Sequence, residues 1–181
     1  MRSTSKILLA VGGGIAAYKS AILCSRLVQS GHDVRVAMTD AATQFIGTAT
    51  LAALSGEPVI RSPFDASMPA GAHIAAVDDI ALMIIAPATA NLIADLATGR
   101  AADVVTTCYL QNVAPVLIAP AMSAPMWDKP AVQRNIKQLR DDGCHLVGPE
   151  SGWLACRKKG FGRMSQPEQI IEAAAGILAT D

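Results

Sequence analysis

The sequence predicts an α/β fold with three layers (α/β/α), Rossmann-like and doubly wound, around a parallel sheet of about six strands. Short apolar runs without alternation recur along the chain, as is typical of strands that are buried on both faces of a sheet. Segments with helical spacing of apolar residues separate these runs, which favours right-handed crossovers between parallel strands. Because no internal repeat or linker interrupts the pattern, we expect one domain over residues 1–181.

The first predicted unit is a buried strand over Lys6–Val11, followed by a glycine turn and a helix over Ile15–Ser30. Gly31 lies where a glycine commonly ends a helix. The residues expected to form the apolar face of this helix are Ile15, Ile22, Leu23 and Leu27.

The rest of the chain repeats this alternation of strands and helices. The further predicted strands are Asp33–Met38, Pro58–Ile60, Ala81–Ala86, Pro115–Ala119 and His145–Val147. Proline has no N–H for a strand ladder, so Pro87 and Pro120 are expected to end the strands before them. The further predicted helices are one capped by Thr39 and reaching Ile46, then Thr48–Leu54, a short piece after His73, one containing Leu92, Ile93 and Leu96, then Val104–Leu110, Trp127–Asp142 and Gln166–Ala179. We expect a loop over Arg61–Ala72 and a mobile flap over Pro149–Arg163.

Composition excludes several classes of function. The 15 Lys and Arg residues balance 15 Asp and Glu residues, so nothing indicates a nucleic-acid partner. No apolar run reaches the roughly 18 residues of a membrane span, and the N-terminus does not resemble a signal peptide, so we expect no membrane partner and a cytoplasmic location. The four cysteines have no CxxC spacing, which argues against a metal site or a disulfide framework. A mean hydropathy of +0.35 instead predicts subunit contacts and a homo-oligomer.

The glycine turn is the first candidate binding site. Gly12-x-Gly14-x-x-Ala17 loosely matches the dinucleotide fingerprint. That fingerprint also requires an acidic residue at the end of the second strand, where this chain has Thr39 and places Asp40 one residue later. A threonine hydroxyl suits a phosphate oxygen better than a ribose diol, so the turn fits a phosphate-bearing mononucleotide at least as well as NAD.

Two further strand ends carry small and polar residues. Thr89, Ala90 and Asn91 follow one strand, where a helix N-terminus offers backbone N–H groups to a ligand. The stretch from Ala119 to Trp127 follows the next strand, and ligands collect at the carboxyl ends of strands in such sheets. We therefore expect both turns to face one crevice, and we interpret the side chains of Met126 and Trp127 as core packing.

Two more positions indicate chemistry. His73 lies at the edge of a loop ahead of the central strand, whereas His32 and His145 precede strands in ordinary turns and are interpreted as structural. Cys156 lies among the positive charges of the flap, which favour an anionic group and a thiolate.

Taken together, the motifs resemble one family. GGIAAYK, MT…A…F, LSG.PV, a single His, APATANLIA, PAM…MW and LAC…G.GRM occur in order over Gly13–Lys19, Met38–Phe45, Leu54–Val59, His73, Ala86–Ala94, Pro120–Trp127 and Leu154–Met164. This ordered set resembles the flavin-dependent cysteine decarboxylases, most of all the bacterial phosphopantothenoylcysteine decarboxylases of coenzyme A biosynthesis, and the resemblance covers nearly the whole chain.

The resemblance implies a role for each matching residue. His73 corresponds to the active-site base and Cys156 to the flap cysteine that finishes the reaction. Substrate contacts are expected from Ser123 and from the flap residues Trp153, Ala155, Lys158 and Arg163. The positions expected to bind FMN are Gly13, Gly14, Ile15, Thr39, Phe45, Thr89, Ala90, Asn91 and Ala121.

The implied activity is a carboxy-lyase reaction that converts 4'-phosphopantothenoylcysteine to 4'-phosphopantetheine. FMN takes electrons from the cysteine S–CH₂ group so that CO₂ leaves, and returns them while Cys156 donates a proton to the enethiol. The resemblance further implies FMN sites between the subunits of a homotrimer, or of a larger assembly of trimers such as a homododecamer. Bacterial relatives often fuse this domain to a phosphopantothenate–cysteine ligase.

The chain departs from the family pattern at two places. Ser123 occupies the position where the family has an Asn that holds the substrate carboxylate. Arg157 and Lys158 follow Cys156, where Gly and an acidic residue are common. Two alternatives therefore stay open: a decarboxylase of peptides that end in cysteine, and a non-catalytic FMN-binding relative.

Overall fold

The computed structural model describes residues 4–64 and 71–180. Its main sheet has five parallel strands in the order β2-β1-β3-β4-β5. Their bounds are β1 Lys6–Val11, β2 Asp33–Met38, β3 Leu82–Ala88, β4 Val116–Pro120 and β5 His145–Leu146. The α/β fold with a parallel central sheet, predicted from the sequence, is thereby confirmed, with five strands in place of about six.

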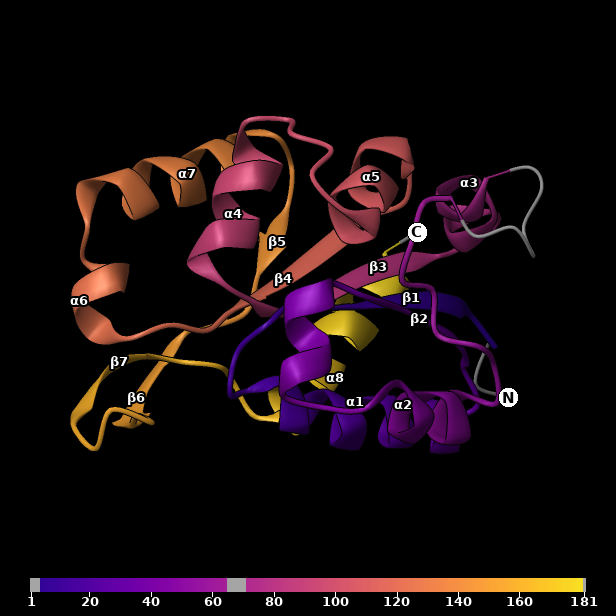
Figure 1. Cartoon of the computed structure of the whole chain (residues 1–181), viewed down its shortest axis with the longest axis horizontal. Helices are drawn as coiled ribbons and strands as arrows, with labels where there is room; N and C mark the ends of the chain where they lie inside the picture. The colour runs from indigo at the N-terminus through magenta and orange to yellow at the C-terminus, as the bar shows by residue number, and fades with distance from the viewer. Residues whose placement is uncertain (1–3, 65–70, 181) are drawn as a thin grey trace.

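Helices cover both faces of the sheet, so the domain has three layers (Figure 1). The helices are α1 Ala17–Gln29, α2 Thr48–Ser55, α3 Ala72–Val77, α4 Ala90–Ala97, α5 Val104–Gln111, α6 Ala124–Trp127, α7 Pro130–Asp141 and α8 Pro167–Leu178, with a 3₁₀ turn, η1, over Asp40–Gln44. Alternate residues of each strand point to opposite faces. Accordingly, Ile7 and Leu9 pack with α1, α2 and α8, whereas Leu8 and Ala10 pack with α3, α4, α5 and α7.

Two polar contacts fix the first helix over the sheet. The hydroxyl of Ser20 in α1 donates to the carbonyl of Ala86 in β3 at 2.7 Å. The N–H of Gly12 donates to the carbonyl of Pro87 at 3.1 Å, which joins the β1–α1 turn to the end of β3. These contacts place the N-terminus of α1 beside the carboxyl end of the central strand.

The predicted flap is a two-stranded antiparallel hairpin, formed by β6 (Glu150–Trp153) and β7 (Lys159–Arg163). It is a separate sheet that lies beyond the carboxyl ends of β3 and β4, next to α6 (Figure 1). The β6–β7 hairpin therefore lies over the same edge of the main sheet as the strand-end turns.

Several expectations about individual elements were wrong. The predicted strand Pro58–Ile60 contributes one bridge, between Ile60 and Ala37, because Pro58 has no N–H and the chain turns away after Ile60. Pro87 does not end β3: the ladder resumes after a register shift, with Ala88 opposite Pro120. Residues 65–70 of the predicted loop lie outside the described residues, and its last residue, Ala72, begins α3.

The predicted apolar face of α1 was half right. Leu23 and Leu27 are buried, but Ile15 and Ile22 are 60% and 41% exposed. The helix instead buries Lys19 and Ser20, which make hydrogen bonds on its inner side. Within the described part of the chain, no helix has the length and apolarity needed to cross a bilayer.

Candidate functional site

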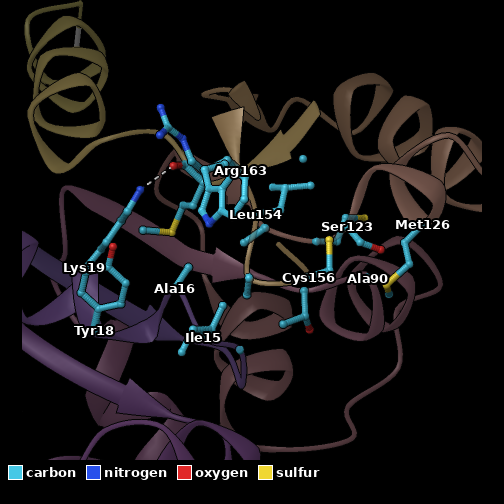
Figure 2. Close-up of a pocket in the computed structure, with 18 of the residues that line it drawn as sticks. Ile15, Ala16, Tyr18, Lys19, Ala90, Ser123, Met126, Leu154, Cys156 and Arg163 are labelled. Carbon is cyan, nitrogen blue, oxygen red and sulfur yellow. Dashed lines mark hydrogen bonds between the residues drawn. The ribbon is translucent and has the colours of Figure 1, made fainter. Parts of the chain in front are cut away.

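A cavity of about 640 Å³ lies at the carboxyl ends of β1, β3 and β4, beneath the β6–β7 hairpin. This volume is within the range of about 300–1,000 Å³ that is usual for small-molecule sites. Its walls come from the β1–α1 turn, the first turns of α1 and α4, the β4–α6 turn and the hairpin (Figure 2). The two strand-end turns therefore face one crevice, as the sequence predicts.

Backbone donors are concentrated in one wall of the cavity. Among residues 4–64 and 71–180, no acceptor is paired with the N–H groups of Gly13, Gly14 and Ile15. At the start of α4, the Thr89 hydroxyl accepts from the N–H of Leu92 at 3.3 Å, which leaves the earlier N–H of Ala90 for a ligand. A helix N-terminus with such free donors favours an anion or a row of carbonyl oxygens.

The two glycines of the first turn serve different purposes. A Cβ on Gly13 would lie 2.4 Å from the Cβ of Ala41, because the β1–α1 turn packs directly on η1. Among the described residues, a Cβ on Gly14 would meet only the methyl group of Thr89, at 3.5 Å. Gly13 is therefore required by packing, while Gly14 keeps cavity space open.

One end of the cavity is lined by a thiol, a hydroxyl and a thioether. Cys156, Ser123 and Met126 lie together at this end (Figure 2). Ser123 is the N-cap of α6, but its side chain makes no capping hydrogen bond, so the hydroxyl is available to a ligand. Met126 is exposed in the cavity and not in the core, contrary to the prediction, whereas Trp127 packs on the ring of Phe161 with the centroids 5.8 Å apart.

The other end of the cavity holds two cations. Lys19 is only 6% exposed, and its Nζ donates to the carbonyl oxygen of Met164 at 2.8 Å. Burial lowers the pKa of Lys19, and the nearby Arg163 lowers this pKa further, while Glu150 opposes the shift. Arg163 donates from Nη2 to Glu150 Oε2 at 3.1 Å, and its buried Nε has no partner among the described residues.

The hairpin is attached to the sheet at defined points. The N–H of Met122 donates to the carbonyl of Gly162 at 2.9 Å, and Leu154 at the hairpin tip is buried. The turn after Leu154 carries Cys156 and then Arg157, whose φ is +61°. The hairpin thus holds the Cys156 thiol over the cavity.

Most of the residues that sequence analysis expects in the site do line this cavity. They are Gly13, Gly14, Ile15, Thr89, Ala90, Ala121, Ser123, Trp153, Ala155, Cys156 and Arg163. Five others do not line it in the single chain, namely Thr39, Phe45, Asn91, Lys158 and His73.

Two of these five residues make hydrogen bonds elsewhere, and a third is exposed. The Thr39 hydroxyl caps η1 by accepting from the N–H of Ala42 at 3.1 Å. Phe45 is exposed at the end of η1. The Asn91 amide donates to Oδ2 of the buried Asp95 at 3.1 Å, one helical turn along α4.

His73 lies far from Cys156 within one chain. It is in α3, which packs against α5 at the opposite end of the molecule from α6 and the hairpin (Figure 1). Its Nδ1 is buried and has no hydrogen-bond partner in the described part of the chain. The fold of one chain therefore does not bring the two expected catalytic residues together.

Lys19 belongs to the motif over Gly13–Lys19, but no pattern in the sequence indicates a function for it. The available signal was a lysine among small residues in the first turn of a helix that starts at a glycine turn. Its burial could not be predicted, because apolar spacing placed the inner face of α1 on Ile15 and Ile22 instead.

Comparison with known proteins identifies related chains. A family model described as Flavoprotein matches residues 1–179. The coenzyme A biosynthesis bifunctional protein CoaBC of Bacillus subtilis is 46% identical over 182 residues, which is 100% of this chain and 45% of that protein. This chain therefore spans less than half the length of that curated relative.

Solved structures are similar as well. The crystal structure of the FMN-dependent cysteine decarboxylase SpaF has a TM-score of 0.80 and 32% identity, covering 94% of this chain and 97% of that one. The FMN binding protein AtHal3 has a TM-score of 0.87 and 25% identity, with 99% of each chain covered.

Proposed function

This chain belongs to the flavoprotein family, and from that premise we propose that it is an FMN-dependent carboxy-lyase that converts 4'-phosphopantothenoylcysteine to 4'-phosphopantetheine. One observation carries the proposal. One cavity is lined both by the N–H donors of the β1–α1 and β3–α4 turns, which have no acceptor among the described residues, and by Cys156 of the hairpin above it. We place this reaction in coenzyme A biosynthesis in the cytoplasm, in one domain over residues 1–181.

The residues of the cavity fit FMN. Gly13, Gly14 and Ile15 present unpaired N–H groups for an anionic or carbonyl oxygen, and Ala90 presents another at the N-terminus of α4. The absence of a side chain at Gly14 leaves room beside Thr89. Ala121 adds a small residue to the wall, as a flat ring system requires. These residues would hold FMN, and Thr39 supports the turn that packs on Gly13.

FMN, when bound, would accept two electrons from the substrate and later return them, and so would supply the electron sink that loss of CO₂ needs without an external reductant. The chain's own residues position the substrate and move protons. The hydroxyl of Ser123 is free to donate a hydrogen bond to the substrate carboxylate. The Cys156 thiol lies at the same end of the cavity and is the proton donor to the product carbon. The β6–β7 hairpin lies above them.

His73 acts in the site of another copy of the chain in this proposal. Among the described residues its Nδ1 has no hydrogen-bond partner, His73 does not line the cavity of its own chain, and the neighbouring Ile74 of α3 is exposed. We propose a homo-oligomer built on trimers, in which His73 and the outward-facing Asn91 of one subunit complete the FMN site of the next. A functional link to a phosphopantothenate–cysteine ligase is consistent with the bifunctional relatives.

The test is to load the protein with FMN, add phosphopantothenoylcysteine, and follow CO₂ release, flavin colour and product mass. The parent should yield the saturated thiol. Replacing Cys156 by Ser should still permit CO₂ release, while the enethiol accumulates and the flavin stays reduced. Replacing His73 by Asn should lower the rate of CO₂ release by a factor on the order of 10²–10⁴.

Other outcomes would overturn the proposal. Saturated thiol formed at the parent rate by the Cys156→Ser variant would make the cysteine structural. Release of CO₂ from a peptide that ends in cysteine, but not from phosphopantothenoylcysteine, would identify a peptide decarboxylase. If neither substrate reacts and FMN still binds, the protein is a non-catalytic relative, and a Ser123→Asn variant tests whether that residue is the cause.

A further inference from the structure

We infer that the cavity end formed by Lys19, Tyr18 and Arg163 is a subsite for a phosphomonoester, and that the substrate's phosphate occupies it. The inference rests on the proposed function and assigns a place to the end of the substrate that does not react. Lys19 is the central residue of this subsite.

The environment of Lys19 is unusual for a lysine. Lysines are almost never this buried unless an anion is paired with them, because removing a charge from water is costly. Here the only partner among the described residues is a neutral carbonyl, that of Met164. An ammonium group has three donors, so two remain available beside the cavity that Lys19 lines.

Arg163 adds a second cation at the same end. It stands opposite Glu150 in the register of the hairpin, and the Arg163–Glu150 ion pair fixes the direction of the guanidinium. A Cβ on Gly152 would lie 2.7 Å from Arg163 Cζ, so the glycine provides the space that the guanidinium fills. Two cations against one carboxylate leave this end of the site with a net positive charge.

Among the described residues, no acidic side chain at the cavity surface compensates the two cations. Of the described residues that line it, Lys19 and Arg163 are the charged ones, and neither Asp nor Glu is among them. A phosphomonoester dianion would supply several acceptors to the free donors of Lys19 and Arg163. Charge-assisted hydrogen bonds of this kind are among the stronger interactions at binding sites.

The position of the two cations decides which end of the substrate they hold. Lys19 and Tyr18 lie at one side of the cavity, and Ser123, Met126 and Cys156 lie at the other (Figure 2). The carboxylate and thiol that react must lie near Cys156. A long substrate with a phosphate at its far end would therefore place that phosphate at Lys19.

The experiment measures phosphate preference by binding and not by turnover. FMN-loaded protein is titrated calorimetrically with 4'-phosphopantetheine and with pantetheine, and the ratio of the two Kd values reports the phosphate contact. We expect the parent to favour the phosphorylated ligand. A Lys19→Met variant should lose on the order of 10- to 100-fold of that ratio, as expected for hydrogen bonds from a charged group.

A second arm distinguishes the phosphate of the substrate from that of the cofactor. Flavin-stripped protein is titrated with FMN and with riboflavin, followed by flavin fluorescence. The ratio of their Kd values should be the same in the parent and in Lys19→Met. If Lys19→Met loses the preference for FMN over riboflavin but keeps the preference for 4'-phosphopantetheine over pantetheine, Lys19 holds the cofactor's phosphate and the inference is wrong.

Control variants separate charge from folding. Lys137→Met removes a lysine from the exposed face of α7, away from the cavity lining, and should leave both ratios unchanged. Lys19→Arg should retain most of the phosphate preference. If Lys19→Met does not fold, Arg163→Gln tests the same subsite and should also lower the ratio.

Different experimental results would contradict the phosphate subsite and the proposed reaction. If the parent decarboxylates phosphopantothenoylcysteine but binds both pantetheine ligands equally, the subsite does not exist and the function remains. If the parent prefers the phosphorylated ligand through Lys19 but releases no CO₂, the subsite remains and the proposed reaction is wrong. Equal ratios in the parent and in Lys19→Met overturn the inference.

Discussion

The N–H of Met122 donates to the carbonyl of Gly162 at 2.9 Å, and this bond joins the β6–β7 hairpin to the turn after β4. The same two residues approach so closely that a Cβ on Gly162 would lie 2.3 Å from the Met122 carbonyl oxygen. The φ of Gly162 is +137°, which side chains other than glycine's rarely permit. The hairpin can therefore contact this turn only with glycine at position 162.

We expect Gly162→Ala to detach the hairpin, at a cost of about 1–3 kcal/mol in the free energy of this contact. Trypsin should then cleave faster after Arg157 and Lys158, which limited proteolysis would measure. Gly176→Ala is the matched control: no atom of the described residues lies within 4 Å of its added Cβ in α8, so helix stability should rise by about 0.5–1 kcal/mol. Unchanged cleavage of Gly162→Ala would mean that the backbone shifts to accept the methyl group.

The effect of substituting Arg157 on stability should depend on whether the new residue tolerates a positive φ, and not on the loss of the charge. Its φ of +61° lies in the left-handed region, which Asn tolerates and β-branched residues do not. Arg157→Asn should leave the melting temperature nearly unchanged, while Arg157→Val should cost about 1–2 kcal/mol locally. Calorimetry and tryptic cleavage of the hairpin tip would compare the two. Equal behaviour of the two variants would show that the turn adopts another conformation.

The glycines of the first turn should fail in different ways. Gly13→Ala forces a contact of 2.4 Å with Ala41 and should lower the melting temperature. Gly14→Ala meets Thr89 at an ordinary 3.5 Å, so the fold should be retained while the added methyl group narrows the cavity. We expect the Gly14 variant to melt like the parent without ligand and to bind FMN more weakly, measured by fluorescence. If the Gly14 variant binds FMN like the parent, the flavin does not use this turn.

Alkaline pH should destabilise the fold through its buried thiols. Burial raises the pKa of Cys24 to about 11 and that of Cys108, mainly for the same reason, to about 12, from an unperturbed value of 9.0. A folded-state pKa above the unfolded value gives a contribution that is fully present below pH 9 and is lost as pH rises through the folded pKa. Lys19, whose pKa is lowered, contributes in the opposite direction.

The melting temperature should therefore fall between pH 9 and pH 12, and it should fall less steeply in Cys108→Ala. The Ala variant starts from a lower value at neutral pH, because a buried sulfur is removed, so the slope and not the absolute value is compared. Parallel slopes for the parent and the variant would exclude this thiol as a cause.

Sequence periodicity predicted the main sheet well because parallel strands buried on both faces appear as continuous apolar runs. It failed at Pro87, where a register shift lets the ladder continue to Ala88, and at Pro58, where one bridge replaces a strand. Both errors concern pairing between distant segments, which a local pattern does not contain.

The site residues at the ends of strands could be predicted from the sequence. Those that depend on which face of α1 is buried, or on the order of strands in the sheet, could not. Thr89 and Ala90 follow directly from a strand-to-helix turn. Lys19 was missed because α1 buries the polar Lys19 and Ser20, whereas Ile22 and the preceding Ile15, which apolar spacing places inside, are exposed. The separation of His73 from Cys156 follows from the order of strands in the sheet, which no single motif reveals.

The β6–β7 hairpin forms its own sheet, and in residues 4–64 and 71–180 no strand ladder connects it to the five central strands. Its opening requires the loss of the Met122–Gly162 hydrogen bond and of the packing of Leu154 and Phe161, while the central ladder stays intact. Opening of this unit should therefore cost much less free energy than global unfolding. In native-state hydrogen exchange, the amides of β6 and β7 should exchange in a separate, faster unit than those of β1 and β3, and a ligand enclosed beneath the hairpin should slow that unit alone.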